Sequence, residues 1–142
     1  LYESALIDAI LIWSALPGAS RHHWGSDFDV VDAALLQPGA PVQLVTQEYG
    51  PGGRFERLTG WLDSNMGRFG FFRPYATWQG GVRPEPWHLS YAEVSVAALQ
   101  VLSLEVLREA LEAADMPGKH TVLSRLPELY QRYVLAVDQP AQ

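Results

Sequence analysis

The sequence predicts an α+β fold in which helices at both ends of the chain flank several short strands. Apolar residues recur at helical spacing near both termini, and short β-branched or aromatic runs bounded by glycine or proline lie between them. The length of 142 residues suits one domain with a core of its own, and no repeat or linker marks a boundary. We therefore expect a single domain over residues 1–142.

The N-terminal part is predicted to contain one helix and one strand. The helix covers about residues 2–15, because apolar side chains repeat at helical spacing over Leu6–Leu11 and Pro17-Gly18 ends the pattern. A glycine turn follows. The aromatic and β-branched residues 28–31 then predict a strand that carries Asp29.

The middle of the chain is predicted to be loop and short strands around one helix. Residues 33–53 are rich in glycine and proline, which predicts a long loop with at most one short strand at 42–45. A helical pattern over about 55–67 comes next. One strand is predicted at 70–75, where Pro74 confines the strand to a sheet edge or ends it. Another is predicted at 87–91, after a proline-containing turn.

The last third of the chain is predicted to be helical. One helix covers 104–114, with Ser103 as its N-cap and Pro117-Gly118 beyond its end. Another covers about 127–137. These helices complete the order of elements that predicts the α+β class.

The composition excludes several classes of protein. An apolar fraction of 48% and a charged fraction of 18% are typical of a globular chain rather than a disordered one. A net charge of −6 and a single lysine argue against a nucleic-acid-binding surface, which needs clustered Lys and Arg. The opening apolar run contains Asp8 and is shorter than the roughly 20 residues that span a bilayer. We therefore expect no transmembrane segment.

One group of residues points to metal chemistry. The chain has no cysteine, so a metal site must use His, Asp or Glu side chains. His22 and Asp29 lie on either side of a glycine turn, and His88 lies much further along the chain. Two imidazoles and one carboxylate are the usual protein ligands of a catalytic zinc ion that keeps an open position. Glu85 is then available as a general base.

The spacing of Glu85 and His88 sets a geometric condition. Residues three apart on a straight strand face opposite ways. Pro86 disfavours the helical conformation at Glu85. The two side chains can therefore converge only if the turn at Pro86 swings the carboxylate round.

The candidate residues lie in two motifs, Ser20-x-His22-x-x-Gly25-x-x-x-Asp29 and Glu85-Pro86-Trp87-His88. The order and spacing of these motifs resemble the D-Ala-D-Ala carboxypeptidase family of zinc metallopeptidases, which includes VanY-type and VanX-type enzymes. That family belongs to the lysostaphin, D-Ala-D-Ala peptidase and hedgehog structural group. The resemblance covers mainly residues 20–91 and implies a small antiparallel sheet flanked by helices.

The resemblance implies a role for each motif residue. The two motif histidines and Asp29 would bind Zn²⁺, and Glu85 would be the catalytic base. Ser20 would help to hold the substrate. Trp87 would line a substrate groove or simply pack against the site. We expect His23 and His120 to be structural or surface residues.

The chain departs from the family pattern at two places. Asp27 stands where relatives commonly carry a small residue, so it could compete for the metal or orient a histidine, and the spacing favours Asp29 as the ligand. The family's catalytic arginine lies well upstream of the first zinc histidine, and none of the 21 residues before His22 is a matching arginine. We expect that the chain, which begins at Leu1, lacks an N-terminal segment, or that Arg73 or Arg83 substitutes.

The resemblance implies a zinc-dependent carboxypeptidase that removes the terminal D-alanine from peptidoglycan stem peptides. An endopeptidase for L-Ala-D-Glu-type bonds and a D-Ala-D-Ala dipeptidase are alternatives within the same group. A non-catalytic zinc-containing binding module is an alternative of another class, which Glu85 argues against and the missing arginine favours. We expect a monomer in the bacterial cell envelope or periplasm, with the cytoplasm as the alternative location.

Overall fold

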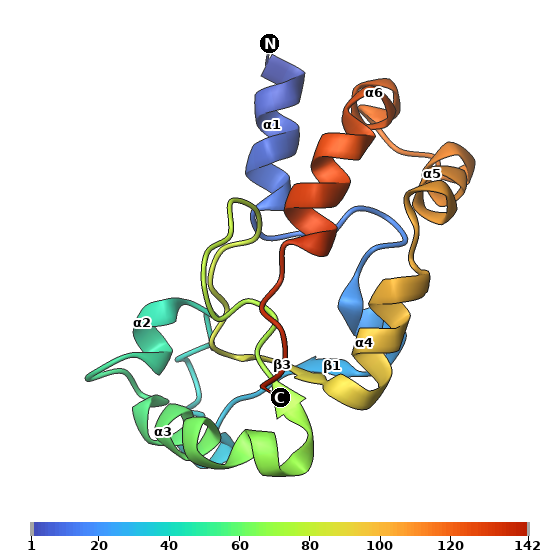
Figure 1. The fold of residues 1–142 in the computed structure, drawn as a ribbon. Coiled ribbons are helices and arrows are strands. Elements are labelled where there is room, and N and C mark those ends of the chain that lie inside the picture. The colour runs from blue at the N-terminus through green and yellow to red at the C-terminus, as the bar shows by residue number, and fades with distance from the viewer. Residues whose placement is uncertain (1, 142) are drawn as a thin grey trace.

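The computed structural model describes residues 2–141. Its centre is a three-stranded antiparallel sheet in the order β1-β3-β2, formed by Asp27–Asp29, His88–Tyr91 and Phe71–Phe72 respectively. Strand β3 lies in the middle because it pairs with both of the other strands. Together with the six α-helices of the described residues, this small sheet confirms the predicted α+β fold (Figure 1).

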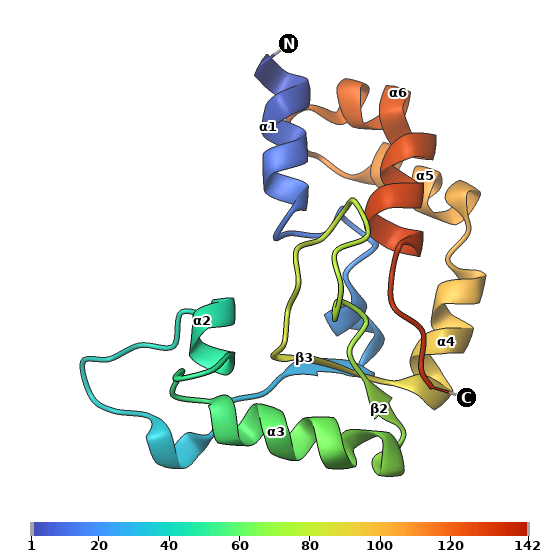
Figure 2. The same ribbon diagram turned by 60° about the vertical axis from the view of Figure 1, so that its left-hand side comes forward.

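The helices lie on different sides of the sheet. Helices α1, α5 and α6 gather at one end of the molecule, whereas α3 lies beyond the sheet at the other end (Figure 1 and Figure 2). None of the described helices is long and apolar enough to cross a membrane. The helices are α1 (Tyr2–Leu11), α2 (Thr46–Tyr49), α3 (Glu56–Asn65), α4 (Ala92–Val101), α5 (Leu104–Ala113) and α6 (Lys119–Tyr130). Shorter turns are η1 (Arg21–Trp24), η2 (Ala33–Leu35), η3 (Met66–Phe69) and the π-helical turn η4 (Gln131–Leu135).

The main hydrophobic core joins α1, α5 and α6. Leu107 and Leu111 of α5 and Leu126 and Leu129 of α6 are fully buried in it. Residues three or four apart share one face of a helix, so these leucines form the inward faces of α5 and α6. The N-terminal helix adds its own apolar face to the same core.

A smaller aromatic cluster supports the part of the chain that carries the sheet. The Tyr49 ring lies 5.0 Å from the Phe55 ring and 5.5 Å from the Trp87 ring, centroid to centroid. The Tyr49 hydroxyl donates a hydrogen bond of 2.7 Å to the Val30 carbonyl. These contacts tie α2 and the start of α3 to the segments beside β1 and β3.

Several predicted elements are confirmed with small shifts in their ends. The predicted strand at 28–31 is β1, the strand at 87–91 is β3, and the helix at 104–114 is α5. Ser103 caps α5 as expected, because its hydroxyl accepts a hydrogen bond of 3.2 Å from the Val106 N–H. The helix predicted at about 55–67 is α3 with the turn η3 after it.

In the N-terminal half the first helix is shorter than predicted, and the predicted loop contains no strand. The helix ends at Leu11 rather than near residue 15, where the Trp13 N–H donates to the Ile10 carbonyl three residues back and tightens the last turn. The loop predicted at 33–53 with at most one short strand at 42–45 has no strand in the described chain and holds the short helix α2. Leu44 has a φ of 52°, a left-handed conformation that interrupts strand geometry.

Two predictions in the C-terminal half are also corrected. The last helix was expected to start near Pro127, but α6 begins at Lys119 and contains Pro127 in its interior. Proline is common at the first position of a helix, which made Pro127 a misleading start signal. Helix α4 was not predicted, because Val94 and Val101 are exposed while Ser95 is buried, so its apolar residues mark no inward face.

Candidate metal centre and active site

A short turn places His22 at the edge of the sheet. The turn η1 covers Arg21–Trp24 and ends at Gly25, whose φ of 74° lies in the left-handed region that glycine adopts without a steric penalty. Strand β1 begins two residues later. The chain therefore reverses sharply, and the His22 ring lies over the residues of β1 and β3.

The pairing of β1 with β3 brings the other two predicted ligands together. Asp29 stands directly opposite His88 in the antiparallel register. Side chains of directly opposed residues lie on the same face of a sheet, within reach of each other. Two residues that are far apart in the sequence thus become neighbours through three residues of strand pairing.

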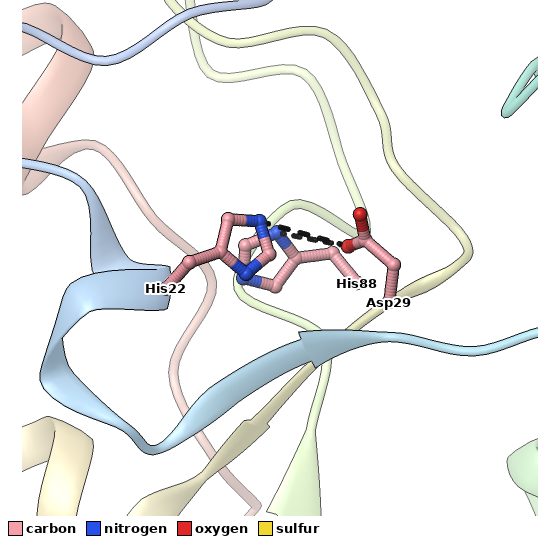
Figure 3. Close-up of side chains that lie close together, drawn as sticks. All are labelled: His22, Asp29 and His88. Carbon is pink, nitrogen blue, oxygen red and sulfur yellow. Dashed lines mark ion pairs between the residues drawn. The ribbon is translucent and has the colours of Figure 1, made fainter.

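The three side chains converge on one point (Figure 3). The Asp29 Oδ1 atom lies 3.7 Å from His22 Nε2 and 3.9 Å from His88 Nδ1. One ligand atom from each residue lies within 4.8 Å of the other two. The centroids of the two imidazole rings are 4.6 Å apart. His22, Asp29 and His88 therefore form a candidate metal site at the surface of the sheet.

Asp27 orients both histidines from behind the candidate site. Its backbone carbonyl lies 3.2 Å from His22 Nδ1, and its carboxylate Oδ2 lies 2.8 Å from His88 Nε2. If these two ring nitrogens carry the N–H donors, the remaining nitrogens, His22 Nε2 and His88 Nδ1, are the ones that would bind a metal, His88 Nδ1 in place of its contact with Glu85. Of the two roles weighed for Asp27, its hydrogen bonds support orientation of the rings.

A buried network holds the Asp27 carboxylate. Arg21 Nε donates to it at 2.8 Å, and the hydroxyls of Ser26 and Ser90 donate at 2.7 and 2.9 Å. Burial alone raises the pKa of the Asp27 carboxyl, but the hydrogen bond with His88 and the charge of Arg21 outweigh burial and leave this pKa below its ordinary value. Asp27 is therefore a stable carboxylate partner for His88.

The turn at Pro86 does bring Glu85 to the candidate site. The His88 N–H donates to the Glu85 carbonyl at 3.1 Å, and the Glu85 N–H donates to the Tyr75 carbonyl at 2.9 Å. These bonds swing the Glu85 carboxylate round, so that its Oε2 lies 3.0 Å from His88 Nδ1. A carboxylate thus lies beside one of the ligand nitrogens without belonging to the converging set of three.

The other predicted site residues lie in different places. Ser20 lines a hollow of about 300 Å³ together with His22, Glu85 and His88, which we call the first hollow. Trp87 is mostly buried, but it lines a second hollow of about 400 Å³ together with His22, Asp29 and Glu85. His22 and Glu85 thus form the boundary between two spaces in which a substrate could lie.

Arg73 lies outside both hollows. Its Nε donates to the Pro86 carbonyl at 2.7 Å, and its guanidinium also pairs with Asp63 of α3. The side chain therefore supports the turn that carries Glu85. Arg83, the other arginine considered, is exposed and also lines neither hollow.

Three residues at the hollows escaped the sequence analysis. Arg21 and Tyr75 line the first hollow, and Trp13 lines both. The Tyr75 ring meets the His88 ring edge-on with centroids 5.1 Å apart, and burial raises the pKa of its hydroxyl. Only Arg21, inside the first motif, carried a signal in the sequence, because its neighbours His22 and Ser20 were already candidates.

Comparison with known proteins identifies the family of the chain. The family model of VanY, D-alanyl-D-alanine carboxypeptidase, matches residues 2–94. An uncharacterized protein of Haemophilus influenzae is 35% identical over 122 residues, which are 84% of this chain and 93% of the relative. A D-alanyl-D-alanine carboxypeptidase of Enterococcus faecalis is 33% identical over 88 residues, which are 60% of this chain and 27% of that enzyme.

No solved structure matches the chain. The match to the family model contains both motifs, the three converging side chains, Glu85 and all three strands of the sheet. Helices α5 and α6, which contribute the fully buried leucines of the main core, lie beyond it. The chain belongs to the VanY family of D-alanyl-D-alanine carboxypeptidases.

Proposed function

We propose that the chain is a zinc-dependent carboxypeptidase that removes the terminal D-alanine from peptidoglycan stem peptides. The observation that carries this proposal is the convergence of His22 Nε2, Asp29 Oδ1 and His88 Nδ1 beside the Glu85 carboxylate. The family match supports the reaction class. Because the substrate is a cell-wall peptide, we also place the protein in the bacterial envelope, as a monomer.

The three donors fit zinc in chemistry and in spacing. Zinc accepts imidazole nitrogen and carboxylate oxygen, with bonds of about 2.0–2.2 Å that place neighbouring ligand atoms of a tetrahedral site about 3.3–3.6 Å apart. The Asp29 oxygen lies 3.7 and 3.9 Å from the two nitrogens, and the three ligand atoms lie within 4.8 Å of one another, so the side chains must close by about 1 Å to complete the geometry. Hydrogen bonds from both imidazole rings to Asp27 are the outer contacts that zinc-binding histidines usually make.

Glu85 is the general base and acid in this proposal. When bound, zinc supplies an acidified water and polarises the carbonyl under attack. The Glu85 carboxylate takes a proton from the attacking water and later gives it to the departing amine of D-alanine. Its place beside His88 Nδ1 is suited to this transfer, because a base must lie within hydrogen-bond reach of the proton that it removes.

The two hollows have separate roles in this proposal. The peptide lies across His22 and Glu85, with Ser20 contacting it in the first hollow and Trp87 forming a wall of the second. Arg73 contributes indirectly, because its hydrogen bond to the Pro86 carbonyl keeps the Glu85 turn in place.

The substitution Glu85→Gln tests the proposal. It keeps the side-chain shape and all three ligand candidates, so zinc content and fold should persist while proton transfer is lost. General acid–base catalysis contributes roughly 10²–10⁴-fold, and release of D-alanine from a stem pentapeptide should fall by that much. Glu109→Gln on the exposed face of α5 is the matched control and should release D-alanine at the unmodified rate.

One observation favours a second candidate, a zinc-containing module that binds peptide without cleaving it. Arg21 is paired with Asp27, and Arg73 is paired with Asp63. Among the described residues that line the two hollows, no arginine is left unpaired to stabilise the developing negative charge. If the zinc-loaded protein binds stem peptides but releases no amino acid and cuts no internal bond, the binding module is the better account.

A further inference from the structure

Trp13 stands where three hollows meet. It lines the first hollow with His88 and the second with Asp29. It also lines a third hollow of about 330 Å³, whose wall includes Arg83 and Pro84. Trp13 is 59% exposed, although it lies only two residues after Leu11, the buried end of α1. A substrate that reaches the candidate metal site along this indole also reaches the third hollow.

Arg83 has a fixed backbone and a free guanidinium. Its N–H donates to the Ile12 carbonyl at 3.3 Å, and two residues later the Glu85 N–H donates to the Tyr75 carbonyl. Pro84 stiffens the segment between these two anchors. The Arg83 side chain is exposed and makes no hydrogen bond or ion pair within residues 2–141. The backbone that carries this positive charge is thus fixed two residues before Glu85, and the charge itself is not paired among the described residues.

The other arginines at these hollows are already paired. Arg21 donates hydrogen bonds to Asp27 and Ser90. Arg132 lines a neighbouring hollow together with Arg83 and forms an ion pair with Glu128. The candidate metal site itself contributes the carboxylates of Asp29 and Glu85, which repel an anionic substrate group. An anion near the scissile bond therefore needs a cation from outside this set, and Arg83 can supply it.

We propose that Arg83, with Trp13 beside it, forms a subsite that binds the free terminal carboxylate of the substrate. This inference rests on the proposed function and sharpens it. A carboxypeptidase substrate carries a carboxylate on the residue that leaves, whereas the internal bond cut by an endopeptidase has none there. Arginine binds a carboxylate through a charge-assisted and often bidentate pair, and the flat indole packs against a small apolar side chain. The subsite thus selects cleavage at the chain end.

The test compares two synthetic stem pentapeptides that differ only at the end, one with a free carboxylate and one with a terminal amide. The zinc-loaded protein should cleave the free acid with a KM about 10- to 100-fold lower than that of the amide, the range of a hydrogen-bonded charge pair. Arg83→Gln should remove this preference by raising KM for the acid alone, with kcat nearly unchanged. Arg83→Lys should keep part of the preference for the free acid. Arg57→Gln, at an exposed position of α3, should leave KM for both peptides unchanged.

Each outcome has one interpretation. If Arg83→Gln leaves the preference intact, or raises KM equally for acid and amide, the subsite does not bind the terminal carboxylate, while the proposed function stands. If the unmodified protein cleaves neither peptide at any zinc concentration, the proposed function fails and this inference fails with it. Loss of the preference in Arg57→Gln would show a general charge effect and would also overturn the assignment.

Discussion

The helical core and the polar network beneath the candidate metal site are both buried, but they are built from opposite chemistry. The core of α1, α5 and α6 is apolar, with Leu107, Leu111 and Leu126 fully buried. The site lies on β1 and β3 over a network of Arg21 and Asp27, charged residues that are only 5% and 6% exposed. One region gains free energy from burial, whereas the other must satisfy every polar group that it buries.

This difference separates stability from function. Each leucine in the core stabilises the fold by about 1.5–3 kcal/mol through burial. The buried charges of the network contribute little as a whole, because desolvation offsets their attraction, yet removal of one partner leaves another unpaired. We therefore expect substitutions in the core to change unfolding with little effect on metal binding, and substitutions at the site to do the reverse.

The largest expected effect is the loss of metal in Asp29→Ala. Asp29 is the only carboxylate of the converging set of three, so its removal should reduce the zinc content of the purified protein from one ion per chain to background. Thermal unfolding of the metal-free protein should change little, because this side chain is partly exposed. Elemental analysis after zinc replenishment measures the result, with Asp115→Ala as an exposed control. Full zinc retention would show that Asp29 is not a ligand.

The substitution Leu126→Ala should show the opposite pattern. It leaves a cavity in the centre of the helical core and should lower the free energy of unfolding by about 2–5 kcal/mol. The folded fraction should still bind one zinc ion per chain, because α6 contributes no residue to the converging set. Urea unfolding followed by circular dichroism measures the free energy of unfolding. Val101→Ala, at a position 74% exposed, is the matched control and should stay within about 0.5 kcal/mol. A parallel loss of zinc affinity in folded Leu126→Ala would mean that the two regions are coupled.

The same contrast explains what could be predicted from the sequence. Apolar periodicity predicted α5 with its cap at Ser103, and spacing singled out His22, Asp29 and His88, which the fold brings together. Hydrogen bonds made across the sheet leave no such pattern. The bond between Arg21 and Ser90 joins residues 69 positions apart, and it depends on the register of β1 against β3. The role of Arg73 escaped prediction for the same reason, because Asp63 lies on a separate helix.

A smaller effect is expected from Asp27→Asn, which removes the charge behind His88 but keeps the shape. Partners that orient zinc ligands are typically worth 10–100-fold in metal affinity, so zinc should bind about that much more weakly without being lost. The backbone carbonyl that contacts His22 persists in this variant, which limits the effect to His88. Competition with a chromogenic chelator measures the affinity. Asp63→Asn, which also removes a carboxylate paired with an arginine, is the control and should bind zinc normally. A loss as complete as that of Asp29→Ala would make Asp27 a ligand.

The smallest effect concerns pH and the proton on His88. Burial alone lowers the pKa of His88, but its hydrogen bonds to Asp27 and Glu85 outweigh burial and raise this pKa above the ordinary value of 6.5. In the metal-free protein the proton therefore persists to higher pH than on an ordinary histidine. This proton stabilises the metal-free fold below the unfolded pKa, and that stability is lost as pH rises through the raised pKa.

Zinc needs the same nitrogen free of its proton, so apparent zinc affinity should fall, by up to about tenfold per pH unit, as pH drops through the raised pKa. A titration from about pH 8 to about pH 5 covers this window. In Asp27→Asn one cause of the raised pKa is absent, so the fall should begin at lower pH. An unchanged midpoint in that variant, or one displaced upward, would show that Asp27 does not govern the proton on His88 and would remove the link between the buried network and the metal site.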